Sequence, residues 1–374
     1  MSATETGEAL AEARRLMTIC NACRYCEGLC AVFPAMEMRR VFTDGDLTYL
    51  ADLCHGCGAC HDDCQFAPPH EFAVAVPLTM ARVRRDAYQA RAWPRALGAL
   101  FARNGLAISV IAALSVAAFL LGFALANDRA SLLAARTGPG AFYALMPHAA
   151  LAPLFSAALL YAILAIALGV RASWRNGGGT VAPTVLWQAV KDAATLRYLD
   201  GGRHDDGGWG CAEDDAVRPD RRRLWHHATA YGFLLCFAAT SVGTLYHYGL
   251  GREAPYPWYD VPVLLGTLGG IGLVIGPLGL LAERRRRSPA RRDAASQGME
   301  RAFIAMLLAS AVSGLALLAL RATPAMGPLL ALHLGIIFAL FITMPYGKFV
   351  HGIYRFAALA RYAAEQRAAA ARTD

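Results

Sequence analysis

The chain has 374 residues, of which 56% are hydrophobic, and it carries a formal net charge of +8. Its mean hydropathy of +0.35 is typical of a membrane protein, because soluble globular domains are only about 45–50% apolar. The basic charge comes mostly from arginines beside apolar runs, which favours a membrane surface and argues against nucleic acid as a partner. The polar N-terminal segment lacks the apolar core of a signal peptide, so we expect no cleaved signal.

Apolar runs recur along the chain from Gly105 onward. Each is about 20 residues long, which is enough to cross a hydrocarbon core about 30 Å thick. They predict six transmembrane helices, at residues 105–126, 148–170, 227–249, 260–282, 302–321 and 329–351. We therefore expect an all-α membrane protein with a helical head at 1–100 and a membrane domain at 101–374, which includes a loop at 171–225.

The distribution of arginines predicts the orientation of these helices. Six spans place both termini on one side of the lipid bilayer, together with the loop 171–225 and the basic run 284–292. The loops on the opposite side, near 127–147, 250–259 and 322–328, hold only a few arginines. By the positive-inside rule, both termini, the head and the loop 171–225 lie in the cytoplasm, and the protein is a multi-pass protein of the cytoplasmic (inner) membrane.

Eight of the ten cysteines form two runs with the same spacing, C-x2-C-x2-C-x3-C. In a reducing compartment this pattern favours metal or redox chemistry over disulfides. Three thiolates of one run bind one 4Fe-4S cluster, while the fourth cysteine reaches the neighbouring cluster. The runs therefore predict two crossed sets of ligands: Cys20, Cys23, Cys26 and Cys64 for one cluster, and Cys54, Cys57, Cys60 and Cys30 for the other.

Zinc is the alternative, since two C-x2-C elements can form a tetrahedral site of four thiolates. It would leave four of the eight regularly spaced thiols unexplained. The remaining cysteines, Cys211 and Cys236, fit neither run, and we interpret them as unreactive small residues. Three histidines near the runs are interpreted as surface or supporting groups: His55, His61 and His70.

Histidine inside or at the end of a membrane span is costly, so the histidines of the predicted spans are candidate haem ligands. His333 and His351 are 18 residues apart in the last predicted span. Because this is five helical turns, we expect them on one face, about 27 Å apart. That separation fits one haem near each membrane surface. In the third span, helical phase favours His226 over His227 as the residue that shares a face with His247.

Matching these residues by depth predicts sites with two axial imidazoles each. His226 pairs with His351 on the cytoplasmic side, and His247 pairs with His333 on the far side. The pattern therefore predicts b-type haem, with one or two bound. The alternative is that histidines at span ends lie in the wet interface and ligate nothing, which we expect for His148 and for one of His226 and His227.

Four segments carry a family resemblance: CNACRYCEGLCAVFPAME at 20–37, APPHEFAV at 67–74, LCFAATSVGTLYHY at 235–248 and TMPYGKFVHGIYR at 343–355. In these segments, and over nearly its whole length, the chain resembles the tricarballylate-utilisation protein B family, also called CitB-domain proteins. The resemblance implies an electron-transfer subunit with iron–sulfur clusters and b-type haem. Such a subunit takes electrons from the reduced FAD of a tricarballylate dehydrogenase and passes them to membrane quinone.

The sequence contains no Rossmann-type glycine fingerprint for FAD. We therefore expect the FAD-containing dehydrogenase to be a separate protein, and the chain to be the electron-transfer subunit of a flavoprotein:quinone oxidoreductase. Two alternatives stay open. A similar module is fused to a flavoprotein in a precorrin oxidase, so the same relay can serve that or another flavoenzyme. The second alternative is a redox sensor or membrane scaffold that reduces no quinone.

Overall fold

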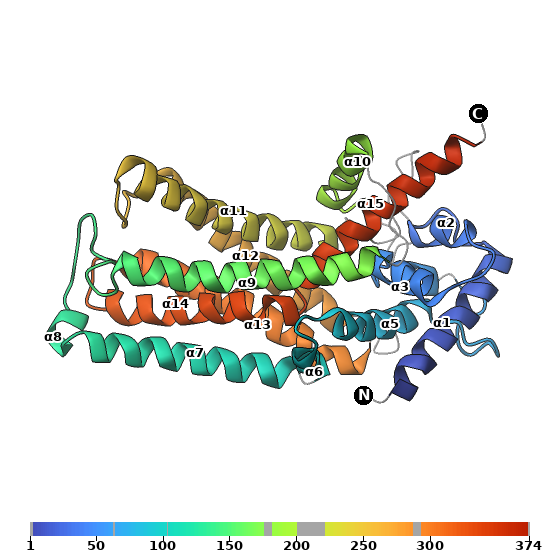
Figure 1. Cartoon of the computed structure of the whole chain (residues 1–374), viewed down its shortest axis with the longest axis horizontal. Helices are drawn as coiled ribbons and strands as arrows, with labels where there is room; N and C mark the ends of the chain where they lie inside the picture. Colours follow the sequence, from blue (N-terminus) through green and yellow to red (C-terminus); the bar gives the residue numbers. More distant parts are fainter. Residues whose placement is uncertain are drawn as a thin grey trace.

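The computed structural model describes residues 3–62, 64–102, 104–175, 182–199, 221–286 and 293–372. Every regular element in these ranges is a helix, which confirms the predicted all-α class for the part of the chain described (Figure 1). Long helices run side by side at one end of the molecule, and shorter helices form the head at the other end. Cys211 and parts of the predicted loop 171–225 and basic run 284–292 lie outside the described residues.

Six of the described helices are long and apolar enough to cross a membrane. They are α7 (Asn104–Ala126), α9 (His148–Trp174), α11 (Arg221–Leu250), α12 (Val261–Arg286), α13 (Gln297–Leu320) and α14 (Met326–Thr343). Between 6% and 50% of each apolar stretch is buried inside the protein. Exposed apolar side chains lie on the surface of several of these helices, among them Leu125 of α7 and Leu268 of α12, as expected of helices surrounded by lipid. The six predicted apolar helices are confirmed, and their place in a bilayer stays a prediction.

The head contains α1 (Ala3–Cys23), α2 (Val32–Glu37), α3 (Asp44–Leu53), α4 (Ala59–Asp62) and α5 (Val76–Arg91). The other described helices are η1 (Arg95–Gly98), α6 (Ala99–Ala102), α8 (Arg129–Leu132), α10 (Pro183–Ala194), η4 (Ala294–Ser296), η5 (Met344–Tyr346) and α15 (Val350–Ala370). Of these, α15 extends beyond the long helices toward the head, and α10 lies beside it (Figure 1).

The C-terminal part of the chain departs from the predicted spans. After α14 come the single 3-10 turn η5, Gly347 in an extended conformation and then the separate helix α15. Pro345 has no N–H to continue the helical hydrogen bonds of α14. The prediction of one continuous span at 329–351 is therefore wrong. The argument that His333 and His351 share one face of one helix is wrong for the same reason, because they lie on different helices, α14 and α15.

The head has a buried core to which both ends of the chain contribute. Leu16 of α1, Leu50 of α3 and Met80 of α5 are fully buried. Leu359 of α15 and Ala189 of α10 belong to the same core. Burial of each large apolar side chain stabilises the fold by about 1.5–3 kcal/mol. The C-terminal helix is thus a structural part of the head, while the predicted boundary at residue 100 stays a prediction.

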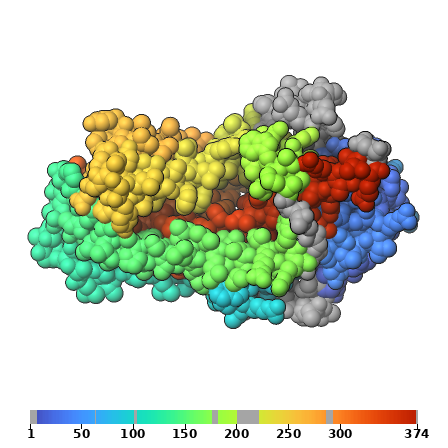
Figure 2. Space-filling view, turned by 45° about the horizontal axis from the view of Figure 1, so that its top comes forward, coloured from blue at the N-terminus to red at the C-terminus, as the bar shows by residue number. Residues whose placement is uncertain are grey.

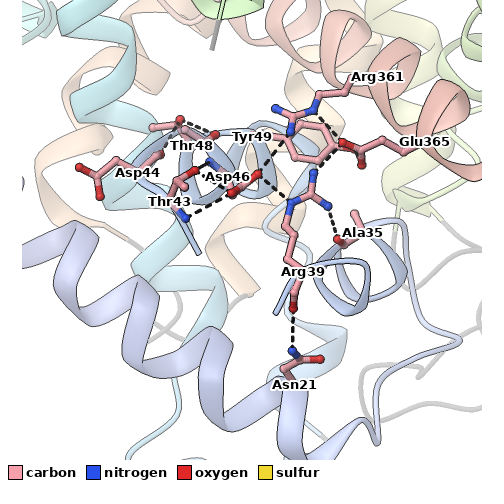
Figure 3. Close-up of polar contacts among 11 residues, drawn as sticks. Asn21, Ala35, Arg39, Thr43, Asp44, Asp46, Thr48, Tyr49, Arg361 and Glu365 are labelled. Carbon is pink, nitrogen blue, oxygen red and sulfur yellow. Dashed lines mark hydrogen bonds and ion pairs between the residues drawn. The ribbon is translucent and has the colours of Figure 1, made fainter. Parts of the chain in front are cut away.

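A network of ion pairs joins α15 to α3 and to the end of α2 (Figure 3). The guanidinium of Arg39 donates to Asp46 at 2.8 Å and to Glu365 at 2.7 Å. Arg361, one turn before Glu365, donates to the same carboxylate at 2.8 Å. Burial alone would raise the pKa of Asp46, but hydrogen bonds from Thr43 and Arg39 hold the pKa below its usual value. The network therefore binds the last helix to the head through charged groups.

Replacing Arg39 by Ala should destabilise the head strongly. The side chain of Arg39 is only 9% exposed, and its loss leaves Asp46 and Glu365 sharing the cation of Arg361, at a cost of up to roughly 3–5 kcal/mol. Arg14→Ala is the matched control. The Arg14 side chain is 44% exposed in its pair with Asp44, and such pairs contribute at most about 1 kcal/mol. Thermal unfolding of the two variants in detergent measures this difference, and equal effects would contradict the role given to Arg39.

Candidate redox metal sites

The first cysteine run lies around a cavity of about 240 Å³ in the head. The helix α1 ends at Cys23, and Arg24 in the left-handed region turns the chain back toward the cavity. The sulfur-bearing residues that line it are Cys20, Cys23, Cys26, Cys60 and Cys64. Cys23 is exposed, so this cavity lies close to the surface of the head. The four residues predicted to ligate one cluster are thus neighbours, although Cys64 comes from the second run.

A second, smaller cavity of about 20 Å³ lies between the two runs and is lined by Cys30, Cys54, Cys57 and Cys60. Gly56 and Gly58 both have positive φ, at 61° and 101°, a conformation that glycine adopts without steric cost. They allow the tight turn that brings the second run around the cavity. The N–H of Gly56 donates to Sγ of Cys54 at 3.3 Å. The other predicted ligand set is thus also gathered in one place.

The cysteines surround cavities and do not converge on a point. Among the residues that the structure describes, no three Cys, His, Asp or Glu side chains could hold a single metal ion. A 4Fe-4S cluster is held by four separate thiolates around a cage. Burial raises the pKa of Cys20 to about 12, with a further increase from nearby Cys26 and Cys64. Binding of iron must therefore displace protons from these thiols. The donor set fits iron–sulfur clusters, and the exact ligands stay a prediction.

The structure brings His226 of α11 close to His351 of α15. Their ring centroids are 6.2 Å apart, with an angle of 73° between the rings. With metal–nitrogen bonds of about 2.0 Å, a metal ion between two imidazoles separates their centroids by roughly 6 Å. Nδ1 of His351 is hydrogen-bonded to the carbonyl of Lys348, which leaves Nε2 as the free ligand atom. The two residues therefore fit the axial ligands of a haem, even though the helical argument for His351 was wrong.

Arginines from three helices connect the second cysteine run to this histidine pair. Arg355, one turn after His351, donates to the backbone carbonyl of Cys54 at 2.7 Å. Arg84 of α5 donates to the same carbonyl. Arg222, one turn before His226, donates to the carbonyl of His55 at 3.3 Å. The loop that carries Cys54 is thus hydrogen-bonded directly to the helices that carry both histidines.

His55 itself lies within this group of arginines. Burial, together with the charges of Arg355 and Arg222, lowers the pKa of His55 well below its usual value. The imidazole is therefore neutral at pH 7 and adds no charge to the site. The backbone carbonyl of His55 accepts a hydrogen bond from Arg222. This contact fits a supporting group beside the site better than a group on the surface.

At the far end of the long helices the structure places the histidines differently. The ring of His247 stacks on the ring of His148, with centroids 3.8 Å apart. His333 is hydrogen-bonded through Nδ1 to the hydroxyl of Ser313 at 2.9 Å. The contact of His148 with His247 was not anticipated, although both residues lie at the far ends of their helices and depth alone could have suggested it. The pairing of His247 with His333 stays a prediction.

Alanine variants of the three far-side histidines should identify the ligands there. Stacked rings 3.8 Å apart leave no room for an iron, whereas Ser313 orients His333 with Nε2 free. We therefore expect His333→Ala and His247→Ala each to remove about half of the haem, one of two groups. His148→Ala is the control and should retain it. The reduced-minus-oxidised spectrum measures the haem content of each variant. If His148→Ala loses haem while His333→Ala keeps its full haem content, the predicted pair is contradicted.

A cleft of about 800 Å³ lies between α9 and α11, and its floor is formed by the C-terminal part of the chain (Figure 2). Its lining is almost entirely apolar and includes Phe233, Phe237, Phe341 and Phe349. Arg171 and Arg175, at the end of α9, also line it. The rings of Phe233 and Phe349 are in contact, with centroids 5.3 Å apart, and Phe349 precedes His351 by two positions. An apolar cleft of this size fits a small ligand, and two of its lining residues, Phe349 and Ile353, are two positions from His351 in the sequence.

Comparison with known proteins identifies the family. The model for citrate utilization protein B matches residues 99–372, and the model for the Fer4-like domain of that protein matches residues 13–90. The citrate utilization protein B of Escherichia coli is 49% identical over 358 residues, which cover 96% of this chain and 93% of that protein. No solved structure matches the chain. The Fer4-like domain indicates an iron–sulfur electron-transfer role. The resemblance found in the sequence is thereby confirmed, and the chain belongs to the citrate utilization protein B family.

Proposed function

We propose that the protein is a membrane electron-transfer subunit that connects a separate FAD-containing dehydrogenase to membrane quinone. In this proposal its cysteines hold two 4Fe-4S clusters and its histidines hold b-type haem. These groups, when bound, transfer single electrons between a flavin and a quinone, which each exchange two. The residues of the chain hold the groups in sequence.

One observation carries the proposal: shared or neighbouring residues connect each candidate site to the next, from the head to the long helices. Cys60 lines both cysteine cavities. From the second cavity, the carbonyl of Cys54 is bonded to Arg355, one turn from His351. The ring of His351 lies 6.2 Å from that of His226, and Phe349 and Ile353, on either side of His351 in the sequence, line the cleft. Because electron transfer falls steeply with distance, such a continuous series is what a relay requires.

The exposure of the sites supports the direction of transfer. Cys23 on the first cavity is exposed, whereas Cys54 on the second is buried. A soluble flavoprotein can therefore approach the first cavity more closely than the second. The cleft between α9 and α11 is apolar and has exposed side chains at its edge, among them Phe237 and Ile163. It suits a quinone that enters from the lipid.

The substrate belongs to the partner enzyme. The Escherichia coli relative is named for citrate utilization, and the sequence resemblance implies tricarballylate. Both are tricarboxylates, so we propose a tricarboxylate-oxidising flavoprotein, with tricarballylate as the first candidate. The arginine distribution supports a cytoplasmic head and an inner-membrane location, where such a partner can reach the cysteines.

Turnover with purified components tests the proposal. The chain is reconstituted in lipid nanodiscs, and iron, acid-labile sulfide and haem are measured under anaerobic conditions. Reduced FAD-containing tricarballylate dehydrogenase and a ubiquinone analogue are then added. We expect reduction of the quinone that depends on both proteins. Reduction of the metal centres without any reduction of quinone would instead favour the sensor or scaffold, and near-stoichiometric zinc without sulfide would exclude the relay.

A further inference from the structure

The carbonyls of the second cysteine run are bonded by an unusual set of donors. Two guanidinium groups, those of Arg84 and Arg355, donate to the carbonyl of Cys54. A third, from Arg222, donates to the next carbonyl, that of His55. Arg84 is only 8% exposed. Its Nη2 also lies 3.8 Å from the position that a Cβ on Gly56 would occupy. Positive charge thus contacts this loop from three helices, α5, α11 and α15.

The equivalent carbonyls around the first cavity have neutral donors. The carbonyl of Cys20 accepts the backbone N–H of Arg24 at 2.8 Å, and the carbonyl of Cys26 accepts that of Leu29 at 3.1 Å. The carbonyl of Cys64 accepts the backbone N–H of Ala67 at 3.0 Å. The charged side chain of Arg24 is exposed, where water and salt screen it. The two cysteine groups therefore differ in the charge that is held close to them.

The carboxylates near the arginines do not remove this difference, because they have cations of their own. Asp52, at the end of α3, is paired with Arg91 at 2.6 Å. Glu300 of α13 is paired with Lys348 at 3.0 Å and also with Arg284. Charges in a site of low dielectric act more strongly than charges in water. Net charge and hydrogen bonds around a cluster set its reduction potential, and added positive charge favours the reduced, more negative form.

We infer that Arg84 and Arg355 raise the reduction potential of the cluster held by Cys54, Cys57, Cys60 and Cys30 above that of the cluster held by the first run. This inference rests on the two clusters of the proposed function. We call the cluster near the exposed Cys23 the outer cluster, and the cluster of Cys54 the inner cluster. One electron then leaves the outer cluster, which is oxidised, and reduces the inner cluster. No proton or bond is exchanged. The two arginines are positioning residues that direct electrons away from the exposed Cys23 and toward His351.

The test is a redox titration with mediators, followed by electron paramagnetic resonance. We expect the inner cluster of the unmodified protein to have the higher midpoint potential. Arg355→Gln and Arg84→Gln each keep a hydrogen-bond donor but remove the charge. Each should lower the equilibrium constant for transfer from the outer to the inner cluster about tenfold, which is about 59 mV for one electron. The potential of the outer cluster should not change.

Two further variants distinguish charge from structure. Arg355→Lys keeps the charge, so the midpoint potential of the inner cluster should stay close to its value in the unmodified protein. A merely structural role of Arg355 does not predict this. Arg24→Gln removes the exposed cation beside Cys23 and should change neither potential. Unchanged potentials in both glutamine variants, or an inner cluster below the outer one in the unmodified protein, would overturn the inference. Because mediators supply the electrons, the outcome does not depend on the partner flavoprotein or on quinone reduction.

Discussion

Replacing Cys64 by Ala is expected to remove the cluster of the first cysteine run, about four of eight cluster irons. Cys64 is 38 positions beyond Cys26, yet both line the larger cavity with Cys20 and Cys23. The other three ligands of that cluster then cannot complete their set. The reciprocal variant, Cys30→Ala, is expected to remove the inner cluster instead, because Cys30 lines the smaller cavity.

Iron and acid-labile sulfide analysis, with electron paramagnetic resonance to identify the remaining cluster, measures both variants. Cys236→Ala is the control, because this thiol lies on α11, far along the chain from both runs, and should leave eight irons (about two clusters) in place. If Cys64→Ala damages only the inner cluster, each run holds its own cluster and the crossed ligation is wrong. Cys60 lines both cavities, so its variant does not separate the two arrangements.

The parts of the fold that could be predicted are those whose signal is local. Each apolar run marks its own helix, so hydropathy found all six long helices. The end of the last one was missed because the apolar pattern continues past Pro345 and Gly347 as far as His351. The chemistry of these two residues was a sufficient signal for a break, since proline cannot continue the hydrogen bonds and glycine adopts extended backbone readily.

The association of the C-terminal helix with the head could not be predicted. Arg39 and Glu365 are 326 positions apart, and no spacing in the sequence links them. The same holds for Arg355 and Cys54, which are 301 positions apart. Such contacts depend on how whole helices pack. They matter here, because they place the second cysteine run beside the histidine pair.

Among the candidate sites, the cysteine groups were the most predictable, because their spacing is short and carries the ligand pattern in itself. The histidine pairs depended on depth in the membrane. Matching by depth paired His226 with His351, and the structure places their ring centroids 6.2 Å apart, since both lie where a helix meets the head. It could not distinguish His148 from His333 as the neighbour of His247, because this choice depends on which helices face each other across the bundle.

Replacing His351 by Ala is expected to stop electron transfer between the head and quinone. His351 is one turn before Arg355, which contacts Cys54, and two residues after Phe349, which lines the cleft. Loss of groups that merely support a metal ligand costs about 10–100-fold in affinity or activity, so loss of a ligand itself should lower quinone reduction by at least about 100-fold. The clusters, which His351 does not ligate, should still be reduced by the partner flavoprotein.

Stopped-flow absorbance and electron paramagnetic resonance follow both steps in one preparation, and the reduced-minus-oxidised spectrum should lose one b-type band. His227→Ala is the matched control. His227 is the sequence neighbour of His226, but its Nε2 lies 3.1 Å from the carbonyl of Ala194 on α10, away from His351. This variant should keep both haem and turnover. If His351→Ala lacks the haem yet reduces quinone at the normal rate, the inner cluster delivers electrons to quinone directly, and the histidine pair lies off the main path.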